Sequence, residues 1–396
     1  METSFGFIEF ELNNLHLLLT FEASNFKKNQ IMGLSCGIVG LTNTGKSTIF
    51  NCFSNTKAEI TNYTFSSSKS NIGMVKVPDP RLKELEKLQP TERLVQVVVD
   101  IVDLPGLAKG ASHGEGVGNQ FLGELRNTDA IIHVLRCFDD ENLPHIEGSV
   151  DPVRDIEILD FELQISDLES IDKRIAKNEK LQKAGDKDAK KAHDVLVKIK
   201  AHLEELKNVR TLGLSEDERS NIGDLFLLTT KPVVYVCNVD DAAALKGNKY
   251  VDEVKAYFKG QDVEIIVIAA KIESEIAELE SDEDKLEFLK DVGLTEPGVN
   301  KLIRAAYHML KLETFFTVGP KEIRAWTIKK GATAPEAAGV IHSDLQRGFI
   351  RAEVMKYHDF IELKSEHACK NAGKLHIEGK KYIVEDGDIL NIRFNV

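Results

Sequence analysis

One glycine-rich segment has the residue types and spacing that suit phosphate chemistry. The run Gly40-Leu-Thr-Asn-Thr-Gly45-Lys46-Ser47 matches the pattern G-x-x-x-x-G-K-[ST]. An apolar run precedes it and residues 46–53 have a helical pattern, which is the strand–loop–helix setting that phosphate binding requires. Its glycines let backbone N–H groups converge on phosphate oxygens, and the helix N-terminus favours negative charge. A surface glycine turn before a helix is the alternative.

The same pattern assigns roles to individual side chains. We expect Lys46 to contact the β- and γ-phosphates and to act in catalysis, and the Ser47 hydroxyl to ligate Mg²⁺. The loop and the first helical turn supply the predicted nucleotide-binding residues Asn43, Thr44, Gly45, Lys46, Ser47 and Thr48. The segment therefore predicts a nucleoside-triphosphate site with a magnesium cofactor.

A carboxylate and a glycine follow a later apolar run. In Val97-Val-Val-Asp-Ile-Val-Asp103-Leu-Pro-Gly106 the second aspartate ends a predicted strand. At this distance from the phosphate loop we expect Asp103 to hold the metal through water and the Gly106 N–H to sense the γ-phosphate. The glycine-rich residues 110–118 are then predicted to be a switch loop, although an ordinary flexible loop would have the same mobility.

Base selection is expected at the tip of a still later strand. Asn238 and Asp241 stand where many GTPases carry Asn-Lys-x-Asp, and Val239 replaces the lysine. Ala269-Ala270-Lys271 resembles the Ser-Ala-Lys element, so Ala270 is expected behind the base. A strand-end turn is the alternative for Asn238 and Asp241, because both residue types favour turns.

Composition limits the class of protein that carries this site. The chain has 396 residues, of which 42% are hydrophobic and 29% charged, so wholesale disorder is excluded. A net charge of -13 argues against binding any polyanion by bulk charge. The five cysteines are scattered without zinc spacing, which indicates free thiols and no disulfide partner. Residues 1–32 lack the features of a signal peptide or membrane span, so we expect a cytoplasmic protein with an N-terminal extension outside the fold.

Periodicity places the site in an α/β protein. Apolar runs typical of buried strands cover residues 34–40, 95–102, 130–138, 232–236 and 263–269. With helical segments between them they predict a mostly parallel sheet that has helices on both faces. Between the third and fourth runs, apolar residues at helical spacing predict a long antiparallel helical hairpin with its turn at residues 184–186: Leu168, Ile171, Ile175, Leu196, Ile199, Leu203 and Leu206. After Lys311, alternating runs such as 351–354 and 381–384 predict a small β-rich domain.

Several long motifs together resemble the YchF/Obg-like ATPase family of Obg-related P-loop proteins. The resemblance extends from Met32 to Val396 and is carried by Gly37-Ile-Val-Gly-Leu-Thr-Asn-Thr-Gly-Lys-Ser-Thr48, Val77-Pro-Asp-Pro-Arg-Leu82, Asp103-Leu-Pro-Gly-Leu-Ala-Lys-Gly-Ala-Ser112, Val134-Leu-Arg-Cys-Phe-Asp-Asp140, Arg324-Ala-Trp-Thr-Ile-Lys-Lys-Gly-Ala-Thr333 and Tyr382-Ile-Val-Glu-Asp-Gly-Asp388. It implies a G domain at 33–140 and 226–311, an inserted coiled-coil hairpin at 141–225 and a β-grasp TGS domain at 312–396. It also implies ATP preferred over GTP, and regulation of translation or stress response on the ribosome or its 50S subunit.

The sequence departs from this family at three places. Asp241 replaces the family's glutamate and restores the acid of GTPases, which keeps a GTPase of the same architecture open. Ser67 stands where the first switch carries a threonine and would have to ligate Mg²⁺ with a hydroxyl that lacks the stabilising methyl. Thr42 and Thr44 replace the family's proline and valine, at positions that mainly affect packing.

The remaining candidate residues concern hydrolysis and partner binding. Leu107 stands where Ras-like enzymes orient water with a glutamine, so we expect slow intrinsic hydrolysis. His145 matches a family histidine and is a tentative catalytic residue, preferred over His113; a loop histidine without a catalytic part is the alternative. Ten basic and four acidic residues lie between Lys173 and Lys200, which predicts ribosomal RNA contact at the hairpin tip or, alternatively, a solvated helix surface. A ribosome adaptor that hardly hydrolyses its nucleotide also stays open.

Overall fold

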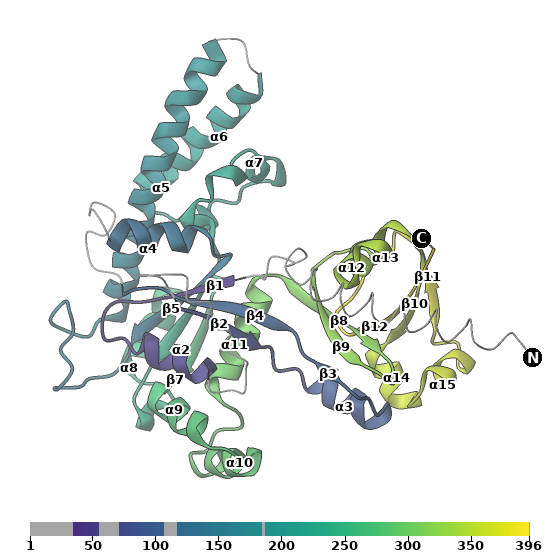
Figure 1. Cartoon of the computed structure of the whole chain (residues 1–396). Helices are drawn as coiled ribbons and strands as arrows, with labels where there is room; N and C mark the ends of the chain where they lie inside the picture. The colour runs from purple at the N-terminus through teal and green to yellow at the C-terminus, as the bar shows by residue number, and fades with distance from the viewer. Residues whose placement is uncertain (1–34, 55–70, 107–116, 184–186, 396) are drawn as a thin grey trace, which may run out of the picture. The chain divides into compact units, whose positions relative to one another are not determined.

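A computed structural model describes residues 35–54, 71–106, 117–183 and 187–395 (Figure 1). The predictions for residues 1–32, Ser67, Leu107 and His113 lie outside the described residues, as does most of the predicted switch loop at 110–118. The hairpin turn at 184–186 lies outside them as well.

A six-stranded, mostly parallel sheet forms the nucleotide-binding part of the chain, as the sequence predicts. Its order is β2-β4-β1-β5-β6-β7, and only β2 runs antiparallel. Every residue of the central strand β5 is buried, as expected for a strand covered on both faces. The strands are β1 (Ser35–Val39), β2 (Asn71–Lys76), β4 (Val98–Asp103), β5 (Ala130–Arg136), β6 (Val233–Asn238) and β7 (Glu264–Ile268).

Helices cover both faces of this sheet (Figure 1). Alternate strand residues separate the faces: Ile38 and Ile132 belong to the core under α2 and α11, whereas Val39 and Ile131 face α4 and α5. The helices of this nucleotide-binding part are α2 (Lys46–Ser54), α4 (Val117–Arg126), α8 (Lys249–Tyr257), α9 (Ala270–Glu278), α10 (Asp282–Asp291) and α11 (Gly298–Met309).

The predicted strand 95–102 is divided between two sheets. Residues Leu94–Val95 form β3, which pairs with residues of the C-terminal sheet, and the chain then enters β4 at Val98. Between β2 and β3 lies α3 (Pro80–Leu88), whose first turn is capped by the Asp79 carboxylate, with Arg81 N–H donating at 3.0 Å. The single-strand prediction was therefore wrong, because the pairing partner of β3 lies more than 200 residues later in the chain.

The insertion between β5 and β6 is a pair of long helices that pack side by side (Figure 1). These are α5 (Pro152–Lys183) and α6 (Lys187–Glu204), followed by η1 (Val209–Thr211), α7 (Glu216–Ser220), η2 (Gly223–Leu225) and η3 (Leu228–Thr230). The predicted apolar stripe lies between the two helices, with Ile171, Leu196, Ile199 and Leu203 buried. Leu206 was wrongly assigned to this stripe: α6 ends before it, and it is 67% exposed at a positive φ.

The C-terminal part, residues 312–395, forms a second six-stranded sheet together with β3. The strand order is β11-β10-β12-β8-β9-β3, and helices pack on this sheet. The predicted strand 381–384 is absent from this sheet. Instead, Ile383 makes an isolated bridge to Thr333, because Ala334 N–H donates to the Tyr382 carbonyl and Val384 N–H to the Ala332 carbonyl. Besides β3, the elements of this part are β8 (Leu312–Val318), β9 (Ile323–Lys329), α12 (Ala334–Ile341), α13 (Ser343–Arg347), β10 (Phe349–Lys356), α14 (Tyr357–Leu363), α15 (Glu366–Asn371), β11 (His376–Glu378) and β12 (Asp388–Phe394). The short helix η4 (Asp241–Ala243) belongs to the nucleotide-binding part and follows β6.

All five cysteines are buried free thiols. Among the described residues, no helix has the length and apolar character needed to cross a membrane.

Candidate functional site

The phosphate loop connects β1 to α2 with a tightly curled backbone. Asn43 and Gly45 have φ values of 66° and 88°, in the left-handed region that glycine enters without strain. A side chain on Gly40 would bring its Cβ to 2.6 Å from the Val134 carbonyl oxygen of β5, so only glycine fits there. The buried Thr44 hydroxyl donates to the Leu41 carbonyl at 3.2 Å and closes the loop.

Lys46 and Asp103 meet at the carboxyl ends of β1 and β4. The Lys46 Nζ lies 2.6 Å from Asp103 Oδ1 and also donates to the Leu104 carbonyl at 2.5 Å. Both side chains are largely buried, with exposed fractions of 10% and 14%. Ser47 is exposed beside Lys46, and Gly106 borders the same cleft. The arrangement concentrates an ammonium, a carboxylate and a hydroxyl at the opening of the phosphate loop.

Asn238 joins three elements of the site. Its side-chain N–H donates to the Thr44 carbonyl of the phosphate loop at 2.8 Å, and its Oδ1 accepts from the Ala270 N–H at 3.0 Å. Asn238 is only 3% exposed, so neither bond is replaced cheaply by water. The residue therefore fixes the phosphate loop to the ends of β6 and β7.

The two residues after Asn238 have different environments. Val239 is 3% exposed and packs in the core beside β6, so its side chain offers no long stem to cover a base. The Asp241 carboxylate lies 3.1 Å from Lys271 Nζ, an exposed ion pair of the kind that is worth less than about 1 kcal/mol. The sequence placed these residues in one region, and the structure brings Val239, Asp241 and Ala270 to the same cleft.

The loop after β5, whose first residues belong to the family motif at 134–140 but were not predicted to bind nucleotide, forms another wall of this cleft. Phe138, Asp139, Asp140 and Leu143 line it. Arg136, 1% exposed at the end of β5, lies beneath the loop and donates to the carbonyls of Phe138 at 3.1 Å and Leu143 at 2.7 Å. An arginine at the end of a mostly apolar strand was the signal that could have identified this support.

His145 lies below the end of that loop and not in the cleft lining. Its Nε2 is 3.0 Å from Asp155 Oδ2, and its Nδ1 accepts the Glu147 N–H at 3.1 Å. The ring is 2% exposed. Burial raises the pKa of Asp155, against the opposing effects of His145 and Arg154. Both ring nitrogens are thus engaged in this arrangement, and a catalytic part for His145 stays a prediction.

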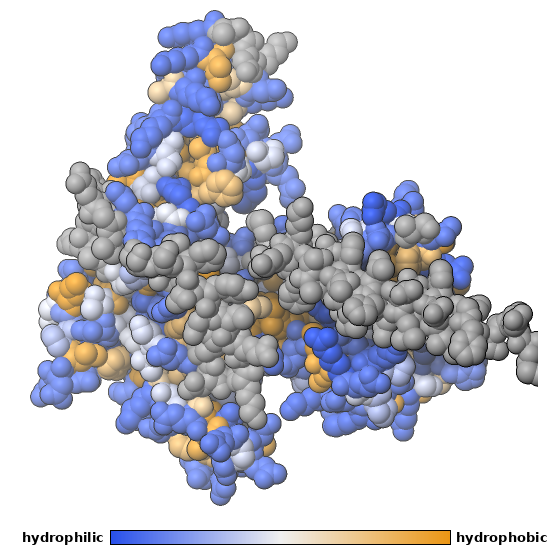
Figure 2. All heavy atoms as spheres, viewed as in Figure 1, coloured by the Kyte–Doolittle hydropathy of each residue, from blue (hydrophilic) through white to orange (hydrophobic). Residues whose placement is uncertain are grey.

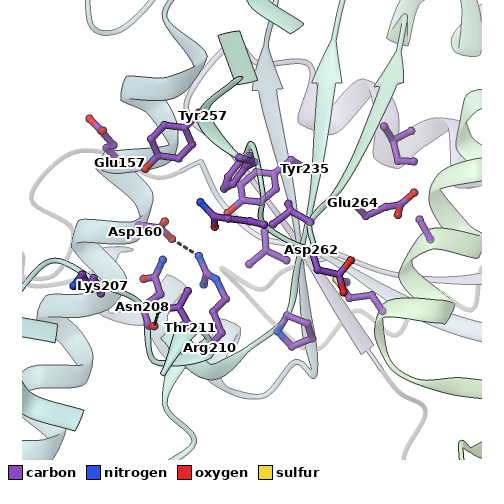
Figure 3. A pocket seen from close by; sticks show the side chains of 18 of the residues that line it. Glu157, Asp160, Lys207, Asn208, Arg210, Thr211, Tyr235, Tyr257, Asp262 and Glu264 are labelled. Atoms are coloured by element: carbon purple, nitrogen blue, oxygen red, sulfur yellow. Dashed lines mark hydrogen bonds and ion pairs between the residues drawn. The ribbon is translucent and has the colours of Figure 1, made fainter. Parts of the chain in front are cut away.

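The cleft occupies about 920 Å³, and a larger cavity of about 1430 Å³ lies at the opposite edge of the sheet. The larger one is lined by Pro232 and Asp262, at the amino ends of β6 and β7, and none of the residues that the structure describes lines both cavities. Figure 3 shows Arg210 reaching toward Asp160 of α5, at 2.8 Å, with Tyr235 nearby. This ion pair joins α5 to η1 within the insertion, and the larger cavity is lined by none of the phosphate-binding residues.

The phosphate loop follows β1, and a carboxylate and an asparagine end β4 and β6, all along the carboxyl edge of a mostly parallel sheet. These features define a P-loop nucleotide-binding domain of the G-protein type. Residues 35–178 match the family model described as 50S ribosome-binding GTPase. Residues 312–395 match the YchF-GTPase_C model, described as a protein of unknown function.

Comparison with individual proteins extends the likeness to nearly the whole chain. The chain is 47% identical to a Bacillus subtilis protein and 46% identical to an Escherichia coli O157:H7 protein, each named "Ribosome-binding ATPase YchF", over 92% of this chain and 100% of theirs. A solved structure titled as the Schizosaccharomyces pombe YchF GTPase matches with a TM-score of 0.81 at 34% identity, covering 91% of this chain and 98% of that one. The chain belongs to the YchF family.

Proposed function

We propose that this chain is a slow, switch-type nucleoside triphosphatase that prefers ATP to GTP and depends on Mg²⁺. It acts in the cytoplasm on the ribosome, where it regulates translation or a stress response. The observation that carries the proposal is the full-length likeness, at 46–47% identity, to proteins named ribosome-binding ATPases. The cleft supplies the corresponding chemistry, because Lys46 and Asn238 line it and the Asp103 carboxylate contacts Lys46.

The residues around Lys46 suit magnesium. The Ser47 hydroxyl and the Asp103 carboxylate are oxygen donors, which Mg²⁺ prefers, and Mg²⁺ usually needs only one or two carboxylates beside phosphates and water. The described residues contain no group of three or more His, Cys, Asp or Glu side chains placed to hold a metal ion. Ser47 and Asp103 would hold the ion, which when bound would supply positive charge that offsets the negative charge developing on the phosphate during transfer.

The protein's own groups perform the remaining steps. Backbone N–H groups of the phosphate loop and the N-terminus of α2 orient the phosphates, and Lys46 exchanges its contacts with Asp103 and Leu104 for phosphate oxygens. Leu107 has no polar atom with which to orient water, so hydrolysis is slow unless a partner supplies that group.

The preference for ATP follows from the base end of the cleft. A GTPase of this architecture uses a lysine stem to cover guanine and an aspartate to accept its N–H groups. Here the lysine is replaced by the buried Val239, and the Asp241 carboxylate is engaged by Lys271. An adenine base needs neither group.

The hairpin tip is the part best suited to ribosomal RNA. Basic residues nearer the hairpin base have acidic partners: Arg174 pairs with Asp224 at 2.5 Å and Lys200 with Asp172 at 2.7 Å. No ion pair within the described residues engages five exposed lysines nearer the tip, namely Lys177, Lys180, Lys183, Lys190 and Lys191. On the face shown in Figure 2 the described part of the hairpin is mostly hydrophilic, with some hydrophobic groups between. Such a cluster attracts the phosphate backbone of structured RNA.

Equilibrium binding of labelled ATP and GTP to the full chain, with Mg²⁺, tests the nucleotide assignment. We expect ATP to bind more tightly, and Lys46→Ala to abolish both tight binding and phosphate release. If purified Lys46→Ala released phosphate as fast as wild type, the enzyme assignment would be wrong and a ribosome adaptor would remain.

Ribosome co-sedimentation tests the partner. Changing Lys180, Lys183, Lys190 and Lys191 to glutamine should weaken pelleting and flatten its salt dependence. The matched control changes four exposed lysines outside the hairpin: Lys255, Lys259, Lys290 and Lys380. Equal pelleting of the two variants would mean that the tip is only a solvated surface.

A GTPase of the same architecture is the second candidate. Asp241 is the acid that guanine recognition uses, and the Schizosaccharomyces pombe relative is titled a GTPase. The Asp241–Lys271 pair is exposed and weak, so a guanine base could displace it. Tighter binding of GTP than of ATP in the experiment above would select this candidate.

A further inference from the structure

Arg136 is a buried cation beside the nucleotide cleft. It ends β5, is 1% exposed and is among the largest fully buried side chains of the described residues. In the parallel ladder it lies in register with Asn238 of β6, and the Cys137 N–H donates to the Asn238 carbonyl at 2.8 Å. Asn238 in turn donates to the Thr44 carbonyl of the phosphate loop. Arg136 therefore lies among the strand ends on which the nucleotide site is built.

The guanidinium of Arg136 donates to three carbonyls of the segment 138–143, which we call the wall loop. Nε donates to Phe138 at 3.1 Å, Nη1 to Leu143 at 2.7 Å and Nη2 to Asp140 at 3.4 Å. The central carbon of the guanidinium lies 4.8 Å from the centre of the Phe138 ring, within the range of a cation–π contact. One planar group thus holds the first, the third and the last residue of the wall loop.

The charge of Arg136 is balanced by carbonyl dipoles. Within the part of the chain that the structure describes, no carboxylate forms an ion pair with it. A buried charge without a counter-charge is costly unless hydrogen bonds satisfy it. A methionine would fill a similar volume without that cost, so packing alone does not account for an arginine here. The wall-loop carbonyls offset the cost, and in return the guanidinium fixes their positions.

The start of the wall loop lies at the nucleoside end of the cleft. Phe138 and Asp139 line the cleft together with Val239, which stands at the expected base-reading position. From the outer side, the Tyr250 hydroxyl donates to the Asp139 carboxylate at 2.7 Å, and Tyr250 packs in the same apolar core as Val239. Arg136 supports this stretch from beneath. The wall loop is therefore held on two sides, next to the place where the base would bind.

We infer that Arg136 is a positioning residue, whose guanidinium gives the wall loop the shape that receives the nucleoside of ATP. The inference rests on the proposed function, because it concerns how the same site binds its nucleotide. Arg136 is buried beneath the residues that line the cleft and acts through the wall loop, so that the cleft is shaped before the nucleotide arrives. Its hydrogen bonds end at Leu143, so a catalytic part for His145 is compatible with this role.

Two substitutions separate the charge of Arg136 from its geometry. Arg136→Lys keeps the charge, but a single ammonium cannot hold three carbonyls in the arrangement that the planar guanidinium spans. Arg136→Met removes the charge and the donors at a similar volume. The matched control is Arg210→Lys, because the Arg210 guanidinium is also largely buried but binds Asp160 at the cavity on the opposite edge of the sheet (Figure 3).

Equilibrium binding of labelled ATP to the full chain, with Mg²⁺, measures both the affinity and the number of sites. We expect Arg136→Lys and Arg136→Met to weaken ATP binding about tenfold, because the nucleotide must then order the wall loop itself. The number of sites per chain should stay the same, and Arg210→Lys should bind ATP within about twofold of wild type. A merely structural role would instead lower the number of sites and leave the affinity of the remaining sites unchanged.

Amide hydrogen exchange reports the wall loop directly. The Asn142 and Leu143 N–H groups donate to the side chain and the carbonyl of Asp140, so their exchange rates follow the order of the loop. In wild type without ATP we expect both amides to be protected. In Arg136→Lys they should exchange about tenfold faster, while the amides of β5 and β6 keep their wild-type rates.

Wild-type ATP affinity in Arg136→Lys would overturn the inference, because charge alone would then suffice. Equal weakening in Arg210→Lys, or equally slow exchange of the wall loop in Arg136→Lys, would overturn it as well. So would a wild-type wall loop that is protected only after ATP binds, and this measurement needs no variant, so it decides even if Arg136→Met does not fold. Failure of wild type to bind ATP would instead refute the proposed function.

Discussion

Replacing Asn238 by alanine tests the assembly of the site most directly. The substitution removes one donor and one acceptor from a position that is 3% exposed, and leaves the Thr44 carbonyl and the Ala270 N–H without their partners. Each buried polar group left unpaired costs about 1–3 kcal/mol. We therefore expect the free energy of unfolding to fall by about 2–4 kcal/mol, because partial relaxation recovers some of the two costs.

The same change should loosen the phosphate loop. Without the bond to Asn238, the Thr44 peptide is no longer fixed to β6, so ATP must order it on binding. A cost of about 1.4 kcal/mol corresponds to tenfold weaker binding, which is the size that we expect. Urea unfolding and equilibrium binding of labelled ATP measure the two effects separately.

Two comparison variants make the test specific. Asn238→Asp fills the same volume and still accepts from Ala270 N–H, but places an oxygen against the Thr44 carbonyl. It should bind ATP as poorly as Asn238→Ala. Asn221→Ala removes a single hydrogen bond at the end of α7 and should cost less than about 1 kcal/mol. Wild-type ATP affinity in Asn238→Asp, or a loss below 1 kcal/mol in Asn238→Ala, would refute the reasoning.

Three further predictions concern other parts of the structure. Burial lowers the pKa of His133 from 6.5 to about 4, so the free energy of unfolding should fall by up to about 3 kcal/mol as the pH falls from 6.5 to 4. His133→Phe should reduce this dependence on pH, as urea unfolding at each pH would measure. Arg81→Met removes the ion pairs to Asp386 at 2.7 Å and to Asp79 at 2.8 Å and should lower the free energy of unfolding by about 1–2 kcal/mol; Asp386→Asn should cost less in this variant than in wild type. Lys271→Met releases the Asp241 carboxylate and should shift the ratio of GTP to ATP affinity about threefold toward GTP in competition binding, whereas an unchanged ratio would show that Asp241 does not read the base.

The elements that the sequence predicted well are those whose signal is local. The phosphate loop needs only its own eight residues, and the buried strands need only a continuous apolar run. Asn238 could be placed because it follows such a run directly. The hairpin was recognisable from apolar residues at helical spacing, although the pattern did not show that α6 ends before Leu206.

The features that the sequence did not reveal depend on distant partners. Two residues, Leu94 and Val95, are too few to show a periodicity, and their partners Ile323 and Arg324 lie in the other sheet. His145 has the residue type of a proton acceptor, and only the positions of Glu147 and Asp155 show that both of its nitrogens are engaged. Chemistry can be predicted from residue type, whereas availability for chemistry depends on packing.

The strands next to the site also connect it to the C-terminal sheet. Asn71 of β2 pairs with Asp103 of β4, so the carboxylate that contacts Lys46 ends a two-stranded antiparallel ladder. At the far end of this ladder Lys76 pairs with Val98, and the intervening chain forms α3 and β3, which packs on the second sheet. A displacement of Asp103 along β4 would therefore shift the β2–β4 ladder against β3, which is held by β9 in the C-terminal sheet. The loop with His145 connects the same cleft to the hairpin, so each of the two other structural parts has its own connection to the nucleotide site.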